Sequence, residues 1–190
     1  MTINITGTGS ALPEKVVTNF DLEKLVETSD EWIQKRTGIA ERRISGGETV
    51  STLAADACSR ALEMAGKTAD EVDLILVATC SPELLLPCCA CQVQDLIGAS
   101  NAVAFDLNAA CSGFLFALNT AYVYLQTGIY KNALVVGSEV LSKLVDWSDR
   151  GTCILFGDGA GAAFVEASGE EIIRSNGRRA GMECMVQGSD

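Results

Sequence analysis

Hydrophobic and polar positions along the chain follow two repeating patterns, which together predict alternating strands and helices. Residues 50–65 place apolar side chains at helical spacing in a single stripe, with Thr49 as the expected cap and Gly66 as the expected stop. Residues 73–80 contain the continuous apolar run LILVA, which is typical of a strand buried on both faces. The same patterns predict strands at 3–9, 102–107, 133–137 and 160–167, and helices at 88–97 and 111–127.

The predicted order of elements is β-α-β-α-β-α-β-β, with residues 11–48 as an insertion after the first strand. Parallel strands joined by right-handed helical crossovers form a layered α/β architecture, which is the fold class that we expect. The helix at 111–127 is apolar nearly all round, so we expect it to be central rather than peripheral.

Length and composition favour a single soluble domain. The chain has 190 residues, of which 48% are hydrophobic, enough to bury a full core. It contains no apolar run long enough to span a membrane, and its first ten residues lack the features of a signal peptide. We therefore expect a cytoplasmic protein that does not bind membranes.

Cysteines and charge restrict the candidate chemistry further. The eight cysteines lie mostly in apolar segments, so we interpret them as reduced thiols, and we expect no metal. The net charge of −11 argues against a nucleic-acid partner. Lys35, Arg36, Arg42 and Arg43 nevertheless lie close together in the sequence, and this local patch could meet an anionic ligand.

Two glycine-rich segments resemble nucleotide-binding loops but lack required residues. GTGSAL at 7–12 has no third glycine and runs into Pro13, so we predict a plain turn. GDGAGA at 157–162 is not followed by a Lys-Ser or Lys-Thr pair, so its glycines are expected to let backbones approach closely.

The segment at 28–36, TSDEWIQKR, has two interpretations. Thr28 with Glu31 fits a capping box, and Trp32 and Arg36 lie four residues apart on one helical face. Composition alone favours a structural role, with a capping Thr28, a Trp32 packed on the core and a solvated Arg36. The functional alternative is an aromatic ring beside a guanidinium, which suits an adenine ring that carries phosphates.

Cys111 is the candidate nucleophile. It lies where the predicted strand at 102–107 gives way to a helix, near free backbone N–H groups that favour a thiolate. Small neighbours leave room for a substrate carbonyl. The alternative is a buried structural cysteine, a role that suits Cys58, Cys80 and Cys153 better.

Cys88 and Cys91 form a Cys-x-x-Cys motif at an expected helix start. This motif could be a redox pair or half of a metal site, with Cys80 as a further thiolate ligand. The chain has no histidine to complete a mixed zinc site.

Several of these segments together resemble one family. The run AFDLNAACSGFLFAL, with VVGSEVLS, SDRGT and FGDGAGAA after it and GTGSALPE, TSDEWIQKRTGI and ERRI before it, resembles β-ketoacyl-acyl-carrier-protein synthase III. This family of condensing enzymes initiates type II fatty-acid synthesis and belongs to the thiolase superfamily. The resemblance implies that residues 1–175 form one β-α-β-α-β-α-β-β half of a five-layer αβαβα fold. Residues 176–190 would then begin the connection to a missing C-terminal half.

The resemblance also implies a mechanism. Cys111 would accept an acyl group from acyl-coenzyme A, which is a substrate and not a resident cofactor. Decarboxylative Claisen condensation with malonyl-acyl-carrier protein would then give a β-ketoacyl-carrier protein. The family's catalytic histidine and asparagine lie in the second half, so the isolated chain is expected to be inactive in condensation.

By the same resemblance, Trp32 and Arg150 sandwich the adenine of coenzyme A, while Thr28, Arg36 and Gly151 help to hold the molecule. This implication reverses the preference that composition gives for a structural Trp32. Leu86 would reach into the acyl pocket of the partner subunit in a homodimer. The family often has phenylalanine there, so the smaller leucine is expected to admit longer or branched primers.

Two other functions remain open. One is a non-catalytic dimerising fragment or scaffold. The other is an acyltransferase of secondary metabolism with the same fold, which would use Cys111 without decarboxylation.

Overall fold

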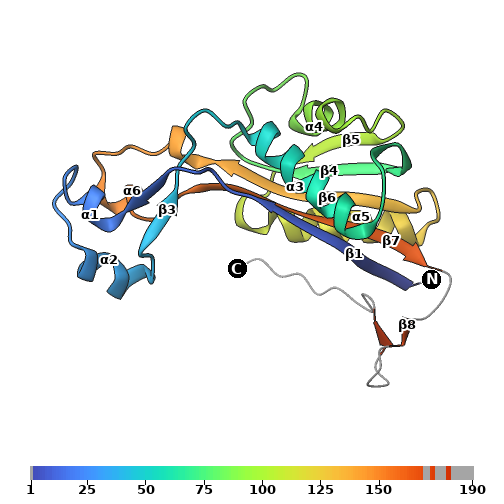
Figure 1. The fold of residues 1–190 in the computed structure, drawn as a ribbon, viewed down its shortest axis with the longest axis horizontal. Coiled ribbons are helices and arrows are strands. Elements are labelled where there is room, and N and C mark those ends of the chain that lie inside the picture. The colour runs from blue at the N-terminus through green and yellow to red at the C-terminus, as the bar shows by residue number, and fades with distance from the viewer. Residues whose placement is uncertain (1, 169–171, 174–178, 181–190) are drawn as a thin grey trace.

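A mixed sheet of five strands forms the centre of the protein (Figure 1). This computed structural model describes residues 2–168, 172–173 and 179–180. The strands lie in the spatial order β1-β7-β6-β4-β5. Their bounds are β1 Thr2–Ala11, β4 Leu74–Ala78, β5 Val103–Leu107, β6 Asn132–Val140 and β7 Asp158–Ser168. All five predicted strands are therefore present.

The directions of the strands correct one expectation. β4 pairs in parallel with β5 and with β6, as predicted, but β7 pairs antiparallel with both β6 and β1. The connection from β6 to β7 contains only the 3-10 helix η3 (Leu141–Lys143) and the short helix α6 (Arg150–Cys153). Without a crossover helix packed on the sheet, the chain returns beside β6 in the opposite direction.

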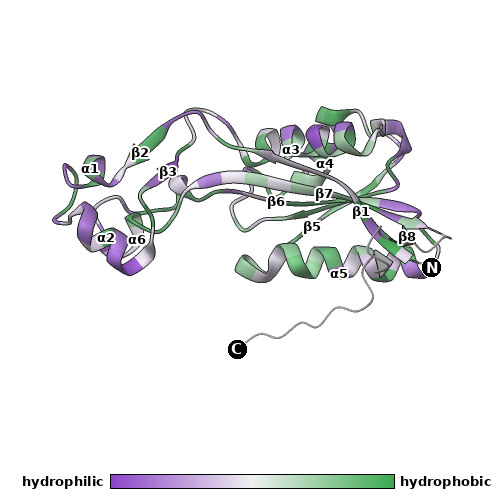
Figure 2. Cartoon of the chain, turned by 60° about the horizontal axis from the view of Figure 1, so that its bottom comes forward, coloured by the Kyte–Doolittle hydropathy of each residue, from purple (hydrophilic) through white to green (hydrophobic). Residues whose placement is uncertain are grey.

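Helices cover the two faces of the sheet, α3 (Val50–Ala65) and α4 (Cys89–Ile97) on one and α5 (Gly113–Gln126) on the other (Figure 2). Ile75 and Val77 of β4 face the first pair, while Leu74 and Leu76 face α5. The continuous apolar run in β4 is thus buried on both faces, as predicted.

The predicted ends of α3 are confirmed. The Thr49 hydroxyl accepts a hydrogen bond from the Thr52 N–H, and Gly66 ends the helix with a positive φ of 66°. Gly98 ends α4 in the same left-handed conformation.

The position of α5 differs from the expectation that it is central. Leu115 and Val123 are each 54% exposed on this helix, because no described element covers its outer side. Within the described residues α5 is therefore an outer layer, although its composition is that of a buried helix.

The turn predicted at 7–12 is wrong, because residues 7–11 belong to β1. A Cβ added to Gly9 would lie 2.1 Å from the carbonyl oxygen of Ala57, and one added to Gly7 would lie 2.1 Å from that of Ala61. These glycines therefore let α3 lie directly on β1.

The close approach expected for the glycines at 157–162 holds for two of them. A Cβ on Gly157 would come within 3.1 Å of the Arg43 carbonyl oxygen, and one on Gly159 within 2.8 Å of the Leu12 side chain. A Cβ on Gly161 would meet nothing within 4 Å.

A small lobe, which we call the end lobe, lies at one end of the sheet (Figure 1). It combines α6 with four elements from residues 11–48, namely β2 Val16–Thr18, α1 Asn19–Leu22, α2 Asp30–Thr37 and β3 Glu41–Arg43. Its core contains Leu22, Ile33, Cys153 and Ile154, so two distant parts of the chain are packed into one unit.

Arg42 ties the end lobe together from inside. Its guanidinium donates to the Asn19 side chain at 2.8 Å and to the carbonyl oxygens of Val17 and Ile154 at 3.2 and 3.3 Å. Burial lowers the pKa of this guanidinium. Arg42 is only 6% exposed, so it does not belong to the surface basic patch expected from the sequence.

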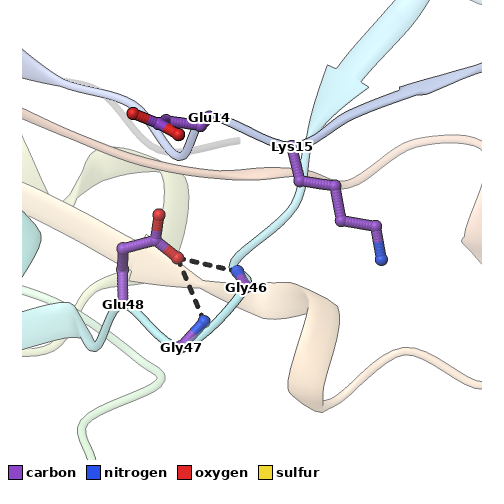
Figure 3. A pocket seen from close by; sticks show the side chains of 5 residues that line it. All are labelled: Glu14, Lys15, Gly46, Gly47 and Glu48. Carbon is purple, nitrogen blue, oxygen red and sulfur yellow. Dashed lines mark hydrogen bonds between the residues drawn. The ribbon is translucent and has the colours of Figure 1, made fainter.

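The Glu48 carboxylate helps to hold the turn that leads into α3 (Figure 3). Glu48 Oε2 accepts hydrogen bonds from the backbone N–H groups of Gly46 and Gly47 at 2.7 and 3.1 Å. Hydrogen bonds from the backbone lower the pKa of Glu48. Glu14 and Lys15 line the hollow outside this turn.

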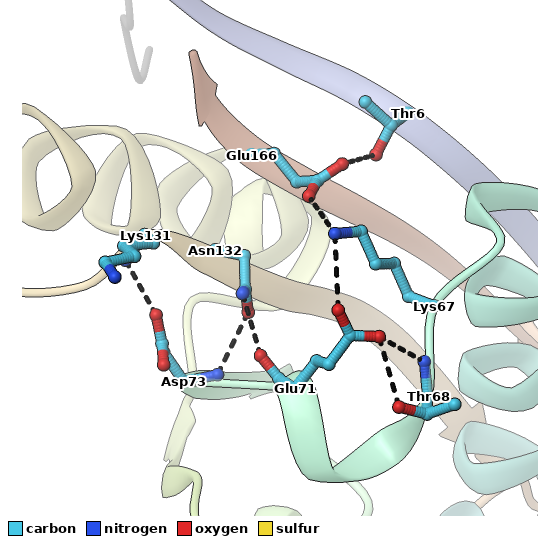
Figure 4. Close-up of polar contacts among 8 residues, drawn as sticks. All are labelled: Thr6, Lys67, Thr68, Glu71, Asp73, Lys131, Asn132 and Glu166. Carbon is cyan, nitrogen blue, oxygen red and sulfur yellow. Dashed lines mark hydrogen bonds and ion pairs between the residues drawn. The ribbon is translucent and has the colours of Figure 1, made fainter. Parts of the chain in front are cut away.

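A polar network ties the end of α3 to the sheet (Figure 4). Lys67 Nζ lies 3.5 Å from a Glu71 carboxylate oxygen and 3.1 Å from one of Glu166 in β7. The Asn132 side chain accepts from the Asp73 N–H at 2.9 Å and donates to the Glu71 carbonyl oxygen at 2.8 Å. These bonds fix the register between the helical turn before β4 and strands β6 and β7.

The expected boundary between residues 175 and 176 lies outside the described residues. Beyond β7 the structure describes only β8 (Ile172–Ile173) and β9 (Arg179–Ala180), which pair antiparallel. Among the described residues, no helix is long and apolar enough to cross a bilayer.

Candidate active site

Cys111 lies on the 3-10 helix η2 (Ala110–Ser112), between the end of β5 and the start of α5. The strand-to-helix junction predicted for it is therefore confirmed, although α5 itself begins two residues later, at Gly113. Cys111 is exposed, so a substrate can reach its sulfur.

The turn before Cys111 is strained. Ala110 has a φ of +45°, in a region that residues with a side chain rarely adopt, and it is the one such residue besides glycine among those described. This conformation costs on the order of 1–2 kcal/mol, which the surrounding packing must supply. Part of that packing is tight, since a Cβ on Gly113 would lie 3.2 Å from the Ala78 Cβ. The strain fixes the direction in which the chain presents Cys111.

Cys111 lines a cavity of about 380 Å³. This volume falls in the range typical of small-molecule sites. Its walls come from the carboxyl ends of β4 and β6, from the start of β7 and from the first turn of α5, and include Ala78, Phe114, Glu139 and Ala160. The ends of parallel strands thus form the cavity, as is usual in α/β proteins.

Glu139 is a site residue that sequence reasoning missed. Its carboxylate accepts hydrogen bonds from the Cys80 N–H at 2.8 Å, from the Thr79 hydroxyl at 3.2 Å and from the Ser81 hydroxyl. It therefore holds the loop after β4 beside the cavity. The only sequence signal is a carboxylate near the end of a buried strand.

The other thiols near the core are poor nucleophiles. Burial raises the pKa of Cys58, Cys89 and Cys153, all of which have no exposed surface. The buried roles expected for Cys58 and Cys153 are therefore confirmed. Cys80 is half-buried rather than buried, and partial burial together with Glu139 raises the pKa of its thiol.

The structure brings Trp32, Arg36 and Arg150 together in the end lobe. The Cζ atom of Arg36 lies 4.4 Å from the centre of the Trp32 ring, and that of Arg150 lies 4.8 Å from it. Both distances are within the range of a cation-π interaction. The shared helical face predicted for Trp32 and Arg36 is confirmed, and α6 contributes Arg150.

The capping box predicted for Thr28 is wrong. Ser29 is the N-cap of α2, because its side-chain oxygen accepts from the Trp32 N–H at 3.2 Å. The Thr28 hydroxyl is buried and has no hydrogen-bond partner, so it does not cap the helix. Gly151, the second residue of α6, donates its N–H to the Asp149 side chain at 2.8 Å.

Leu86 lies apart from these residues, in the loop between β4 and α4. Its side chain is 86% exposed, and those of the preceding Leu84 and Leu85 are 50% and 89% exposed. Leu86 is not among the described residues that line the cavity at Cys111.

Comparisons with known proteins identify similar sequences and folds. The family model described as 3-oxoacyl-[acyl-carrier-protein] synthase III matches residues 105–181. The chain is 60% identical over 171 residues to the β-ketoacyl-[acyl-carrier-protein] synthase III of Clostridium acetobutylicum, covering 90% of the chain and 53% of that relative. It is 56% identical over 172 residues to synthase III 1 of Bacillus cereus, covering 90% of the chain and 55% of that relative.

Solved structures agree with this similarity. The crystal structure of 3-oxoacyl-[acyl-carrier-protein] synthase III from Aquifex aeolicus superposes with a TM-score of 0.87 at 51% identity, covering 89% of the chain and 55% of that protein. The priming β-ketosynthase of the R1128 polyketide pathway superposes with a TM-score of 0.85 at 39% identity, covering 88% and 50%. The predicted α/β fold is thus confirmed, and the chain spans about half the length of the relatives that it matches.

Proposed function

We propose that this chain, which belongs to the β-ketoacyl-acyl-carrier-protein synthase III family, supplies the acyl-accepting part of a condensing enzyme that initiates fatty-acid synthesis. Cys111 accepts the acyl group of acyl-coenzyme A. The observation that carries this proposal is the exposed thiol, presented by a strained turn at the opening of a 380 Å³ cavity.

In the first half-reaction the Cys111 sulfur attacks the thioester carbonyl carbon. A new carbon–sulfur bond forms, the bond to the coenzyme A sulfur breaks, and the leaving thiolate takes a proton. The tetrahedral intermediate carries an oxyanion, which the backbone N–H of Cys111 would help to stabilise.

In the second half-reaction malonyl-acyl-carrier protein loses carbon dioxide, and its carbanion attacks the Cys111 thioester. The β-ketoacyl product leaves on the carrier protein, and Cys111 regains its thiol. Stabilising that carbanion needs hydrogen-bond donors, for which the family uses a histidine and an asparagine. The chain has no histidine, so we place this function in the remaining part of the protein and expect the isolated chain not to condense.

Coenzyme A would bind at the end lobe as a substrate. Trp32 and Arg150 would enclose its adenine, while Arg36 and the unpartnered Thr28 hydroxyl would help to hold the molecule with Gly151. Arg150 rests directly against the Trp32 ring, so its side chain must move outward to admit the adenine.

Trp32→Ala in the intact protein is expected to raise the KM for acyl-coenzyme A about tenfold, the loss of one aromatic contact. Because Trp32 belongs to the end lobe and does not line the cavity at Cys111, kcat should change little. Steady-state kinetics at varied acyl-coenzyme A measures both values. Trp32→Phe keeps a flat ring and should retain most of the affinity, and a fall in kcat at unchanged KM would contradict the assignment.

The function is tested by incubating the intact protein with radiolabelled acetyl-coenzyme A and then with malonyl-acyl-carrier protein. Label should appear first on the Cys111 peptide and then in a β-ketoacyl-carrier product. A protein that is never acylated would refute the proposal. Acylation without condensation by the intact protein would instead favour the alternative of an acyltransferase that uses Cys111 without decarboxylation.

We further propose a homodimer in which Leu86 enters the acyl pocket of the partner subunit. The exposure of three successive leucines supports a covered position in an assembly. The same labelling assay, run with branched and longer acyl-coenzyme A, tests the expected breadth of primers. Loading by acetyl-coenzyme A alone would rule out this breadth of primers.

The presence of Cys111 together with the Trp32, Arg36 and Arg150 cluster argues against a purely structural scaffold.

A further inference from the structure

We propose that Cys88 and Cys91 form a redox-active dithiol, which a small disulfide such as glutathione disulfide oxidises to an intrachain disulfide. The two sulfurs lie 3.4 Å apart at the start of α4. Both residues are half-buried and free, so the pair is accessible and complete within one chain. This inference is independent of the proposed condensing activity.

The local structure explains why these two thiols meet. Cys88 is the N-cap of α4, which makes Cys91 the third residue of the helix. Side chains at these two positions face each other in a capping box, as Thr18 and Asp21 do at α1. Cys89, which lies between them, is fully buried in the core instead.

The dithiol is not needed to cap its helix. No side chain of α4 caps the helix, and the N–H groups of Cys89 and Ala90 donate instead to the Asp106 carboxylate of β5, at 2.9 and 2.7 Å. The first turn of α4 is thus anchored independently of Cys88 and Cys91. Joining their sulfurs, which need to come to about 2.05 Å, leaves that anchor in place.

A small reagent can approach the pair from the side of Cys91. Cys91 lines a hollow of about 190 Å³ beside α4, together with Gln94, Asp95, Gly98 and Ser100. The neighbouring Cys88 thiol and partial burial raise the pKa of Cys91. Because Cys88 lies at the N-terminus of α4, we assign the first attack to Cys88 and the second to Cys91.

The reaction balances as two exchanges. The Cys88 thiolate attacks glutathione disulfide, forming a mixed disulfide and releasing one glutathione. The Cys91 thiolate then attacks the Cys88 sulfur, forming the protein disulfide and releasing the second glutathione. The protein loses two hydrogen atoms and glutathione disulfide is reduced.

Among the described residues no cluster of three metal-ligating side chains is present, so the metal site considered from sequence gains no support.

The position of the pair links it to the neighbouring loop. Cys88 directly follows Leu86 and Pro87, and the Cys91 sulfur lies 3.8 Å from the Ala104 carbonyl oxygen of β5. A disulfide would therefore join the end of the loop that contains Leu84, Leu85 and Leu86 to the first turn of α4, which rests on β5.

The test is mass spectrometry of the intact protein after incubation with glutathione disulfide, alkylation of free thiols under denaturing conditions and cleavage after acidic residues. The fragment covering 84–95 contains Cys88, Cys89 and Cys91. We expect this fragment to lose two hydrogen atoms, with only Cys89 alkylated and Cys88 bonded to Cys91. A glutathione adduct on the exposed Cys111 shows that the oxidant reached the protein.

Variants locate the bond. Cys88→Ser and Cys91→Ser should each abolish the intrachain disulfide, the second leaving a stable glutathione adduct on Cys88. The control Cys80→Ser, which changes another half-buried thiol, should leave the disulfide unchanged. Separate adducts on both cysteines, a bond to Cys89 or Cys80, or a reduced pair in a sample with oxidised Cys111 would each overturn the proposal.

Discussion

Cys111→Ala in the intact protein is expected to abolish transfer of the acyl group from acyl-coenzyme A, with a loss of about a thousandfold or more. On the proposed function the Cys111 sulfur forms the covalent intermediate, and alanine has no atom to take its place. The strained φ at Ala110 and the cavity walls remain, so coenzyme A should still bind. Intact-protein mass spectrometry after acetyl-coenzyme A, together with a binding titration, measures the two effects separately.

Cys88→Ser is the matched control for this experiment, since it changes a thiol on a neighbouring element that does not line the cavity. It should acylate at the normal rate. Acylation of Cys111→Ala at an unchanged rate would show that another thiol carries the acyl group. Cys80 would then be the next candidate, because it lies in the loop that Glu139 holds beside the cavity.

The second large effect is on stability. Gly9→Ala is expected to lower the free energy of unfolding by at least about 3 kcal/mol, because the added methyl group would overlap the Ala57 carbonyl oxygen at 2.1 Å. That oxygen belongs to the backbone of α3, so relief requires the helix to move away from β1. Urea denaturation of the intact protein, followed by circular dichroism, measures the change.

Gly161→Ala provides a control on the adjacent strand. A Cβ there meets nothing within 4 Å, so the free energy of unfolding should change by no more than about 0.5 kcal/mol. Equal effects of the two substitutions would show that β-strand propensity, and not contact with α3, sets the requirement for glycine.

Much of the sheet and its helices could be predicted because burial imposes a period on the sequence. The apolar run of β4 reflects burial on both faces of the strand, and the apolar stripe of α3 reflects burial on one face of the helix. The direction of β7 could not be predicted in this way. Its apolar pattern is the same in either direction, and only the missing crossover helix between β6 and β7 distinguishes the two.

The strand-to-helix junction at Cys111 was predicted correctly, whereas the capping box at Thr28 was not. The junction follows from a strand pattern, small residues and a helix pattern in succession, which together fix where the strand ends and the helix begins. Thr28 and Ser29 are both good caps, however, and only the backbone conformation selects Ser29. With Ser29 as the cap, the buried Thr28 hydroxyl is left without a hydrogen-bond partner.

Glu139 shows the limit of sequence reasoning for the site. Its role depends on the register in which Ala78 of β4 lies beside Gly137 of β6, which brings the loop after β4 within reach of its carboxylate. Residues about sixty positions apart must first be aligned by the whole sheet. The spacing of residues along the sequence does not predict that alignment.

The contact of Arg150 with Trp32 has a thermodynamic consequence for catalysis in two stages. An incoming adenine would displace a guanidinium from the ring, so its net binding free energy is the difference between two stacking interactions. On the proposed function the adenine is the same before and after acyl transfer, so competition by Arg150 would speed the release of coenzyme A while weakening the binding of acyl-coenzyme A to the same extent. The end lobe would thereby exchange one ligand for the next without first having to expose Trp32 to water.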